Sequence, residues 1–156
     1  DTSGILVFGL SKFGQNRISR QFQERQTSKI YQAVVAGHLE GEGTVDVPVI
    51  YDPSRPPLHI AEPSHNKPAL THWQATEHFQ IQGQDVTRVK LTPITGRSHQ
   101  LRVHMQYLGH PIIGDTLYAT EEQQNLSDRL CLHAERLSFN HPKTEQPIDF
   151  YCAVPF

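Results

Sequence analysis

The stretch from Thr87 to Gly114 constrains the fold of this chain most, because its apolar residues change from a period of two to a period of three and four. Val89 and Leu91 alternate with charged side chains, which is typical of a strand with one buried face. Pro93 ends this alternation, since proline has no amide hydrogen to donate to a sheet. The sequence therefore predicts a strand that is followed closely by a short helix.

This helix is predicted to begin at Arg97 and to end at Gly109, since glycine commonly terminates helices. Its apolar side is formed by Leu101, Met105 and Leu108. Its first two turns are crowded with polar side chains, namely Arg97, Ser98, His99, Gln100, Arg102 and His104. Cations are disfavoured at a helix N-terminus, so the two arginines indicate anionic partners nearby. Arg102, at the shoulder of the apolar side, could reach a carboxylate in a cleft, and Arg97 could face a phosphate. An ordinary surface helix with solvated charges is the alternative.

The remaining elements are mostly strands. The apolar run near the start, within residues 1–10, predicts a central strand buried on both faces. A helix is expected from Ser11 to Arg25, and loops from Tyr51 to Asn66 and from Thr120 to Asp128. Further strands are expected at Ser28–Gly37, Leu39–Pro48, Lys67–Phe79, Val86–Leu91, Arg129–Phe139 and Pro147–Val154. With two main helices and no regular βαβ rhythm, this pattern predicts an α+β fold with a mixed, mostly antiparallel sheet in one domain, residues 1–156.

Charge and composition limit the possible classes of protein. The chain of 156 residues has a formal net charge of −2, which argues against a globally basic nucleic-acid binder. A local basic patch is still compatible with this value, because the segment from Ser11 to Lys29 holds five cations and only Glu24 as an acid. No apolar run approaches 18 residues, so we expect no membrane span. Cys131 and Cys152 fit buried free thiols of a cytoplasmic protein better than a disulfide.

The ten histidines do not form a recognisable metal motif. His99 and His104 are five residues apart and lie on different faces of the predicted helix, and neither His-Glu-x-x-His nor Cys-x-x-Cys occurs. Ser3 and Ser98 lack the glycines of a nucleophile elbow, and no phosphate-binding Gly-x-x-x-x-Gly-Lys is present. We therefore expect no metal and no cofactor, and neither acyl transfer nor ATP chemistry.

The segment TPITGRSHQLRVHMQYLGHPIIGDTLY, which begins at Thr92, resembles the signature of the RluA-type family of RNA pseudouridine synthases. Four other blocks are similar to that family and occur in the same order: DTSGILV at Asp1, KIYQAVVAG at Lys29, KPALTHW at Lys67 and RLCLHAERLSFNHP at Arg129. The resemblance covers essentially the whole chain. It implies a pseudouridine synthase catalytic domain, which converts uridine to pseudouridine in a structured RNA without cofactor or metal.

The resemblance also implies roles for single residues. Tyr31 aligns with an active-site tyrosine that stacks on the target base. The catalytic aspartate of the family would lie two positions before Asp1, so we expect this chain to be the C-terminal portion of a catalytic domain and to be inactive alone. Arg102 is expected to pair with that aspartate, because a cation beside a buried carboxylate keeps it ionised.

Eight polar side chains are expected to bind the RNA, mainly its phosphates: Lys12, Arg17, Arg20, Lys29, Lys67, Arg97, His99 and Gln100. Relatives of this type act on an rRNA loop of the large ribosomal subunit and on a tRNA anticodon stem-loop, so both RNAs are expected partners of a monomeric enzyme. Two alternatives remain open. One is an RNA-binding module or inactive relative that uses the same cleft without chemistry, and the other is a structural domain with an incidental basic helix.

Overall fold

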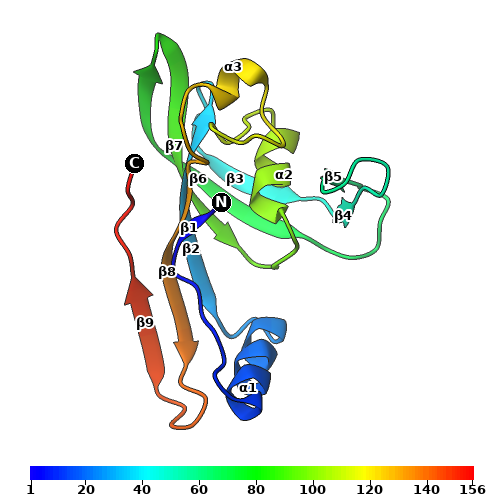
Figure 1. Ribbon diagram of the computed structural model, residues 1–156, viewed down its shortest axis with the longest axis vertical. Coiled ribbons are helices and arrows are strands. Elements are labelled where there is room, and N and C mark those ends of the chain that lie inside the picture. The colour runs from blue at the N-terminus through cyan, green and yellow to red at the C-terminus, as the bar shows by residue number, and fades with distance from the viewer.

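A computed structural model describes residues 1–156 and is built around one seven-stranded sheet (Figure 1). Its strands are β1 (Ser3–Gly4), β2 (Ser28–Ala36), β3 (Glu42–Asp46), β6 (Leu70–Ile81), β7 (Gln84–Pro93), β8 (Leu132–Asn140) and β9 (Pro147–Tyr151). They run in the order β1-β8-β2-β7-β6-β3, with β9 also paired to β8. Only β1 and β8 are parallel, so the expected α+β fold with a mixed, mostly antiparallel sheet is confirmed.

The helices are α1 (Lys12–Gln23), α2 (Gln100–Tyr107) and the single-turn α3 (Glu121–Gln124), and none is long and apolar enough to cross a membrane. The side chain of Ser11 caps α1 by accepting a hydrogen bond from the amide of Gly14 at 3.1 Å. Helix α2 begins three residues later than expected. His99, with φ of 57°, has a left-handed backbone that cannot continue a helix. Arg97 therefore lies outside the helix.

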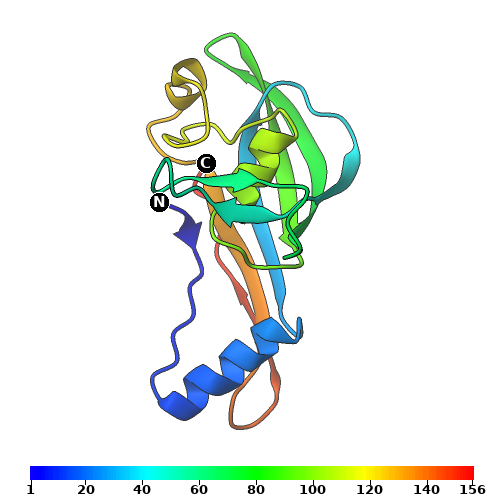
Figure 2. The ribbon, with the colours of Figure 1, turned by 90° about the vertical axis from the view of Figure 1, so that its right-hand side faces the viewer.

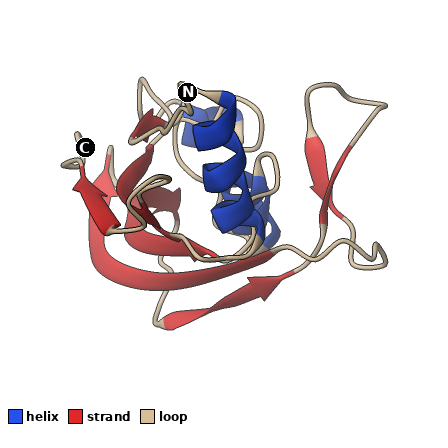
Figure 3. Ribbon diagram, turned by 90° about the horizontal axis from the view of Figure 1, so that it is seen from below, coloured by secondary structure: helices blue, strands red, loops and turns tan.

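The sheet is curved, and the helices lie on one side of it (Figure 3). Helix α2 packs on this face through the apolar core. Leu101 and Met105 from the helix contact a core cluster that includes Val35 of β2 and Leu91 of β7. Leu91 lies in the part of Thr87–Gly114 whose apolar residues have a period of two. Leu101 and Met105 lie in the part with a period of three and four. The strand-to-helix switch therefore encodes the main layer contact of the fold.

Two expected loops contain regular structure. The segment expected to be a loop from Tyr51 to Asn66 holds β5 (His59–Ala61), which pairs with β4 (Val49–Tyr51) in a separate two-stranded sheet. The other, from Thr120 to Asp128, holds α3 with a capping box formed by Thr120 and Gln123. Both elements are only three or four residues long, so they leave little periodicity in the sequence.

The expectation of a central strand near the start of the chain is wrong. Only Ser3 and Gly4 pair, with β8 alone, and the chain then leaves the sheet and runs along the molecule to α1 (Figure 2). Leu6, Phe8 and Leu10 are 73%, 74% and 100% exposed. A continuous apolar run favours a buried strand, but it does not supply the second neighbouring strand that burial on both faces requires.

The two cysteines are free, as expected, but only Cys131 is buried. Cys152 follows the last residue of β9, at the edge of the sheet, and is exposed. The expectation that both thiols are buried is therefore wrong for Cys152.

Protonation of His104 should make the fold unstable in mild acid. The ring is fully buried, where Nδ1 bonds the Thr71 hydroxyl at 2.7 Å and Nε2 bonds the Val47 carbonyl at 2.8 Å. Burial lowers the pKa of His104 below its usual value. The unfolded chain therefore binds the proton first as the pH falls, and folding stability is lost below about pH 6.5, by up to about 1.4 kcal/mol per pH unit.

Urea denaturation at several pH values between 8 and 5 would measure this loss. In His104→Gln, which cannot take up the proton, the free energy of unfolding should fall less steeply over the same range. An equal pH dependence in wild type and His104→Gln would show that other groups cause the loss. His72→Gln is the matched control, because His72 is exposed on β6 and should leave the wild-type slope unchanged.

Candidate active site

A cavity of about 560 Å³ lies between the first residues of the chain, β2, β8 and the N-terminal end of α2. Four cations line it: Lys29, Arg97, Arg102 and Arg136. No Asp or Glu side chain is among the residues of its wall. The volume is typical of a small-molecule site, and the charge favours an anionic ligand. The cavity wall is therefore cationic although the chain as a whole is weakly acidic.

Arg102 is held in the cavity wall by an ion pair with Asp115. Its Nε and Nη2 donate to the two carboxylate oxygens of Asp115 at 2.8 and 2.6 Å. The Asp115 side chain is fully buried and the Arg102 side chain is 10% exposed. Such a two-point contact fixes the plane of the guanidinium, and neither bond uses Nη1. The Nη1 edge of Arg102 is therefore the part that can engage a ligand or a second carboxylate.

The backbone of the next turn supports Asp115. Its Oδ1 also accepts hydrogen bonds from the amides of Leu117 and Tyr118, at 2.9 and 3.2 Å. Gly114, with φ of 74°, precedes it, and a β-carbon there would lie 1.8 Å from the Arg129 carbonyl oxygen. Only glycine therefore lets this turn approach the segment that leads into β8. The turn thus places the Asp115 carboxylate beside Arg102 of α2.

Aromatic side chains pack around the same arginine. The Cζ atom of Arg102 lies 5.2 Å from the centroid of the Tyr118 ring. The Tyr118 hydroxyl lies 2.5 Å from Nδ1 of His99 and accepts a hydrogen bond from the amide of His59 at 2.9 Å. Burial lowers the pKa of His99, and the nearby Arg102 cation and His59 lower it further. His99 is therefore a neutral hydrogen-bonding group at neutral pH, in a backbone conformation that is rare outside glycine.

Tyr31 reaches the cavity from β2. The pairing of β2 with β8 shifts register between Ile30 and Tyr31, and an irregularity of this kind commonly re-aims a side chain. Tyr31 is half-buried and lines the cavity together with Arg102. Burial raises the pKa of its phenol, so the hydroxyl stays protonated at neutral pH. The two residues expected to be catalytic therefore share one cavity.

Two of the expected RNA-binding cations lie at the rim of this site. Lys29 precedes Tyr31 by two residues, and its Nζ lies 5.5 Å from the centroid of the Phe22 ring. Burial lowers the pKa of Lys29. Arg97 donates from Nε to the Pro68 carbonyl at 2.9 Å, which leaves its two terminal nitrogens available. Both residues also line a second depression that continues from the cavity.

Of the other expected RNA-binding residues, His99 and Gln100 line the cavity and the remaining four lie outside it. Lys12 and Lys67 are exposed outside it. Arg17 pairs with Glu145 at 2.5 Å and Arg20 pairs with Glu24 at 2.6 Å, both at the surface. Gln100 does line the cavity, but its amide is used internally: it donates to Leu70 and Thr71 and accepts from Thr95 and Arg97. Gln100 therefore holds the turn before α2 in place.

Similar sequences and structures among known proteins point to one family. The sequence model described as RNA pseudouridylate synthase matches residues 1–107. A protein of Pasteurella multocida named dual-specificity RNA pseudouridine synthase RluA is 49% identical over 156 residues, which are 99% of this chain and 70% of that protein. The protein of the same name from Escherichia coli K12 is 44% identical over 157 residues, with the same two coverages.

The chain belongs to the RNA pseudouridylate synthase family. Among solved structures, human RNA pseudouridylate synthase domain containing 1 superposes with a TM-score of 0.82 at 33% identity, over 94% of this chain and 62% of that one. Human RNA pseudouridylate synthase domain containing 4 has the same fold, with a TM-score of 0.68 at 24% identity. The chain thus spans between 62% and 70% of the length of these relatives.

Sequence reasoning missed three residues of this synthase site. The sequence does not predict Asp115 as the partner of Arg102, which lies 13 positions earlier. Tyr118 ends the signature segment, and Arg136 lies within a strand whose pattern indicated only packing. For Asp115, the signal was a lone acid directly after a turn glycine in an apolar segment. Neither of the other two carries a comparable local signal.

Replacing Asp115 should destabilise the synthase fold strongly. Asp115→Asn leaves the Arg102 guanidinium buried without its counter-charge, which costs about 3–5 kcal/mol in comparable buried pairs. Glu77→Gln is the matched control, because it breaks the pair with Arg88, at 3.3 Å, in which the Glu77 side chain is 59% exposed. That change should cost less than about 1 kcal/mol. Equal free energies of unfolding for the two variants in urea titrations would contradict a buried role for the Arg102–Asp115 pair.

Proposed function

We propose that the protein isomerises uridine to pseudouridine in structured RNA, and that the cavity lined by Tyr31 and Arg102 holds the target uracil. The observation that carries this proposal is their convergence in one cationic cavity, in a chain of this family. A uracil inside a stem or a stacked loop must leave the stack to enter such a cavity. The positive wall fits the phosphates that accompany the flipped nucleotide.

In the proposed reaction, the bond between C1′ of the ribose and N1 of the uracil breaks, the base turns, and a new bond joins C1′ to C5. The proton on C5 is lost and N1 gains one, so substrate and product are isomers. The family resemblance assigns the attacking carboxylate to an aspartate two positions before Asp1. Thr2 and Ser3 form part of the cavity wall, so we expect that aspartate to lie at the same wall.

Arg102 is proposed to orient and stabilise this catalytic carboxylate. The ion pair with Asp115 uses Nε and Nη2, so the Nη1 edge would bond the aspartate and keep its pKa low. Tyr31, with a protonated phenol at neutral pH, would stack on the uracil ring and exclude water from it. Its hydroxyl would assist the transfer of the proton lost from C5.

The RNA is proposed to approach across Lys29 and Arg97, where the cavity opens into the second depression. Lys12, Lys67, Arg17 and Arg20 would contact more distant phosphates. Arg17 and Arg20 would contribute less, since each already has an acidic partner. By the same resemblance, we propose an rRNA loop of the large ribosomal subunit and a tRNA anticodon stem-loop as substrates. We further propose that residues 1–156 are the C-terminal portion of one catalytic domain, and that the protein acts as a cytoplasmic monomer whose reaction uses no metal or cofactor.

Arg102→Lys tests the catalytic proposal, because it keeps the charge but loses the planar two-point contact. Release of tritium from C5 of labelled uridine in a substrate RNA should slow by at least about 100-fold, while the Kd for the RNA stays within about threefold. Arg88→Lys is the control, since Arg88 lies outside the cavity, and it should keep the wild-type rate. Wild-type tritium release by Arg102→Lys would refute the role of Arg102. Tight RNA binding without any product by the full-length wild-type protein, which includes the upstream aspartate, would favour a binding module instead.

Salt titration tests the proposed RNA path. If Lys29 and Arg97 each neutralise one phosphate, then Lys29→Ala and Arg97→Ala should each reduce the slope of log Kd against log salt concentration by about 1. Arg20→Ala should change that slope less, because Arg20 is already paired with Glu24. Slopes that respond only to Arg20→Ala would show that the RNA crosses α1 and not the cavity rim.

A further inference from the structure

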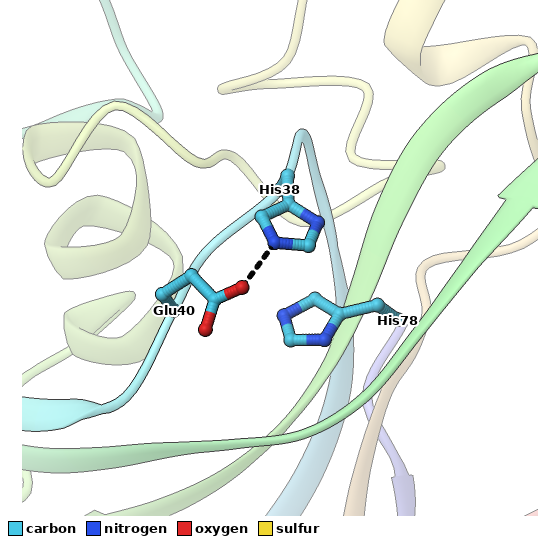
Figure 4. Close-up of side chains that lie close together, drawn as sticks. All are labelled: His38, Glu40 and His78. Carbon is cyan, nitrogen blue, oxygen red and sulfur yellow. Dashed lines mark hydrogen bonds and ion pairs between the residues drawn. The ribbon is translucent and has the colours of Figure 1, made fainter.

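A second group of chemically reactive side chains lies outside the cavity. His38 and Glu40 come from the loop between β2 and β3, and His78 comes from β6 (Figure 4). One donor atom from each of the three residues lies within 4.8 Å of the other two. None of them lines the cavity that holds Tyr31. The group therefore needs an explanation separate from the proposed RNA chemistry.

The backbone around this group is held firmly. The Gly37 amide bonds the Asp85 carbonyl at 2.8 Å, and the Leu39 amide bonds the Thr87 hydroxyl at 3.0 Å. At the far end, the Gly41 carbonyl accepts from the amide of Ala75 on β6 at 2.8 Å. Leu39 itself is buried. Because Leu39 points into the protein, its two neighbours His38 and Glu40 lie outside and on the same side of the loop.

The three side chains already interact. Nε2 of His38 bonds a carboxylate oxygen of Glu40, and the rings of His38 and His78 stack with centroids 4.0 Å apart. Nε2 of His78 bonds the Leu39 carbonyl at 2.7 Å, so a backbone carbonyl oxygen also lies beside the three side chains. The Glu40 side chain is exposed, where a glutamate is an anion at neutral pH. Two imidazoles and a carboxylate are ligands that zinc-class cations prefer.

We propose that His38, Glu40 and His78 bind one zinc-class divalent cation, which clips the β2–β3 loop to β6. Ligand atoms around tetrahedral zinc lie about 3.3 Å apart, as follows from zinc–ligand distances of about 2.0–2.1 Å. A separation of 4.8 Å or less thus closes by about 1.5 Å of movement, which exposed side chains can make without moving the backbone. A histidine nitrogen that binds the cation carries no proton, so the proton with which His38 Nε2 now donates to Glu40 moves to Nδ1, and the ring stays neutral.

Calorimetric titration of zinc chloride into chelator-treated protein tests this site. Wild type should bind one zinc ion, whereas His38→Ala, His78→Ala and Glu40→Gln should each raise the Kd by at least about tenfold, since each removes one ligand. His72→Ala is the matched control, because His72 is exposed on the same strand and bonds Thr44 instead. It should bind like wild type. Magnesium chloride should give no heat, because magnesium takes oxygen ligands.

Two further measurements keep the proposal falsifiable. Saturating zinc should raise the melting temperature of wild type by about 5 °C or more and leave that of His38→Ala and His78→Ala unchanged. Cobalt(II) in place of zinc should give visible absorption in wild type and in His72→Ala only. Absence of zinc binding in wild type, or unchanged binding in His38→Ala and His78→Ala, would overturn the site. Because none of its ligands lines the cavity, loss of zinc binding should leave the rate of pseudouridine formation unchanged.

Discussion

The ion pair between Arg102 and Asp115 is the contact on which the proposed active site depends. It joins α2 to the turn before α3, and both partners are removed from water. A buried ion pair of this kind adds little net stability over an apolar contact, because desolvation offsets the attraction. Its effect is geometric: two parallel hydrogen bonds fix the guanidinium plane, and the remaining edge of Arg102 faces the site. Rigid support of this kind is what precise chemistry requires.

The cations of this protein differ in whether they have an acidic partner. Of the four cations in the cavity wall, Arg102 pairs with Asp115 and Arg136 pairs with Asp149, whereas Lys29 and Arg97 have no acidic partner. The positive charge that a ligand meets in the cavity therefore comes mainly from Lys29 and Arg97, although the net charge of the chain is −2. Charge paired at the surface contributes little to stability or to binding, while charge in a cavity with low-dielectric walls attracts an anion. Local charge at the site, more than net charge, is the property that suits an RNA substrate.

The proposed zinc site uses the same sheet for a different purpose. Strands β6 and β7 hold the β2–β3 loop through backbone and threonine contacts, so the exposed ligands need only side-chain rotation to converge. The cavity depends on a polar pair buried beneath a helix, and the loop depends on exposed imidazoles. A substitution in one site should therefore leave the other site unchanged. The property of the unchanged site can thus serve as a control in each test.

Local sequence patterns determined much of this protein. The alternation at Val89 and Leu91, the helix after it and the cap at Ser11 follow from periodicity and capping, which depend on neighbouring residues only. The resemblance to the family, seen in the sequence alone, predicts that Tyr31 and Arg102 belong to one active site. Tertiary structure decided the rest. Leu6 is exposed because the start of the chain pairs only briefly with β8. Arg102 has the partner Asp115 because the chain turns back after α2. Such contacts join residues that are far apart along the chain, and no local propensity encodes them.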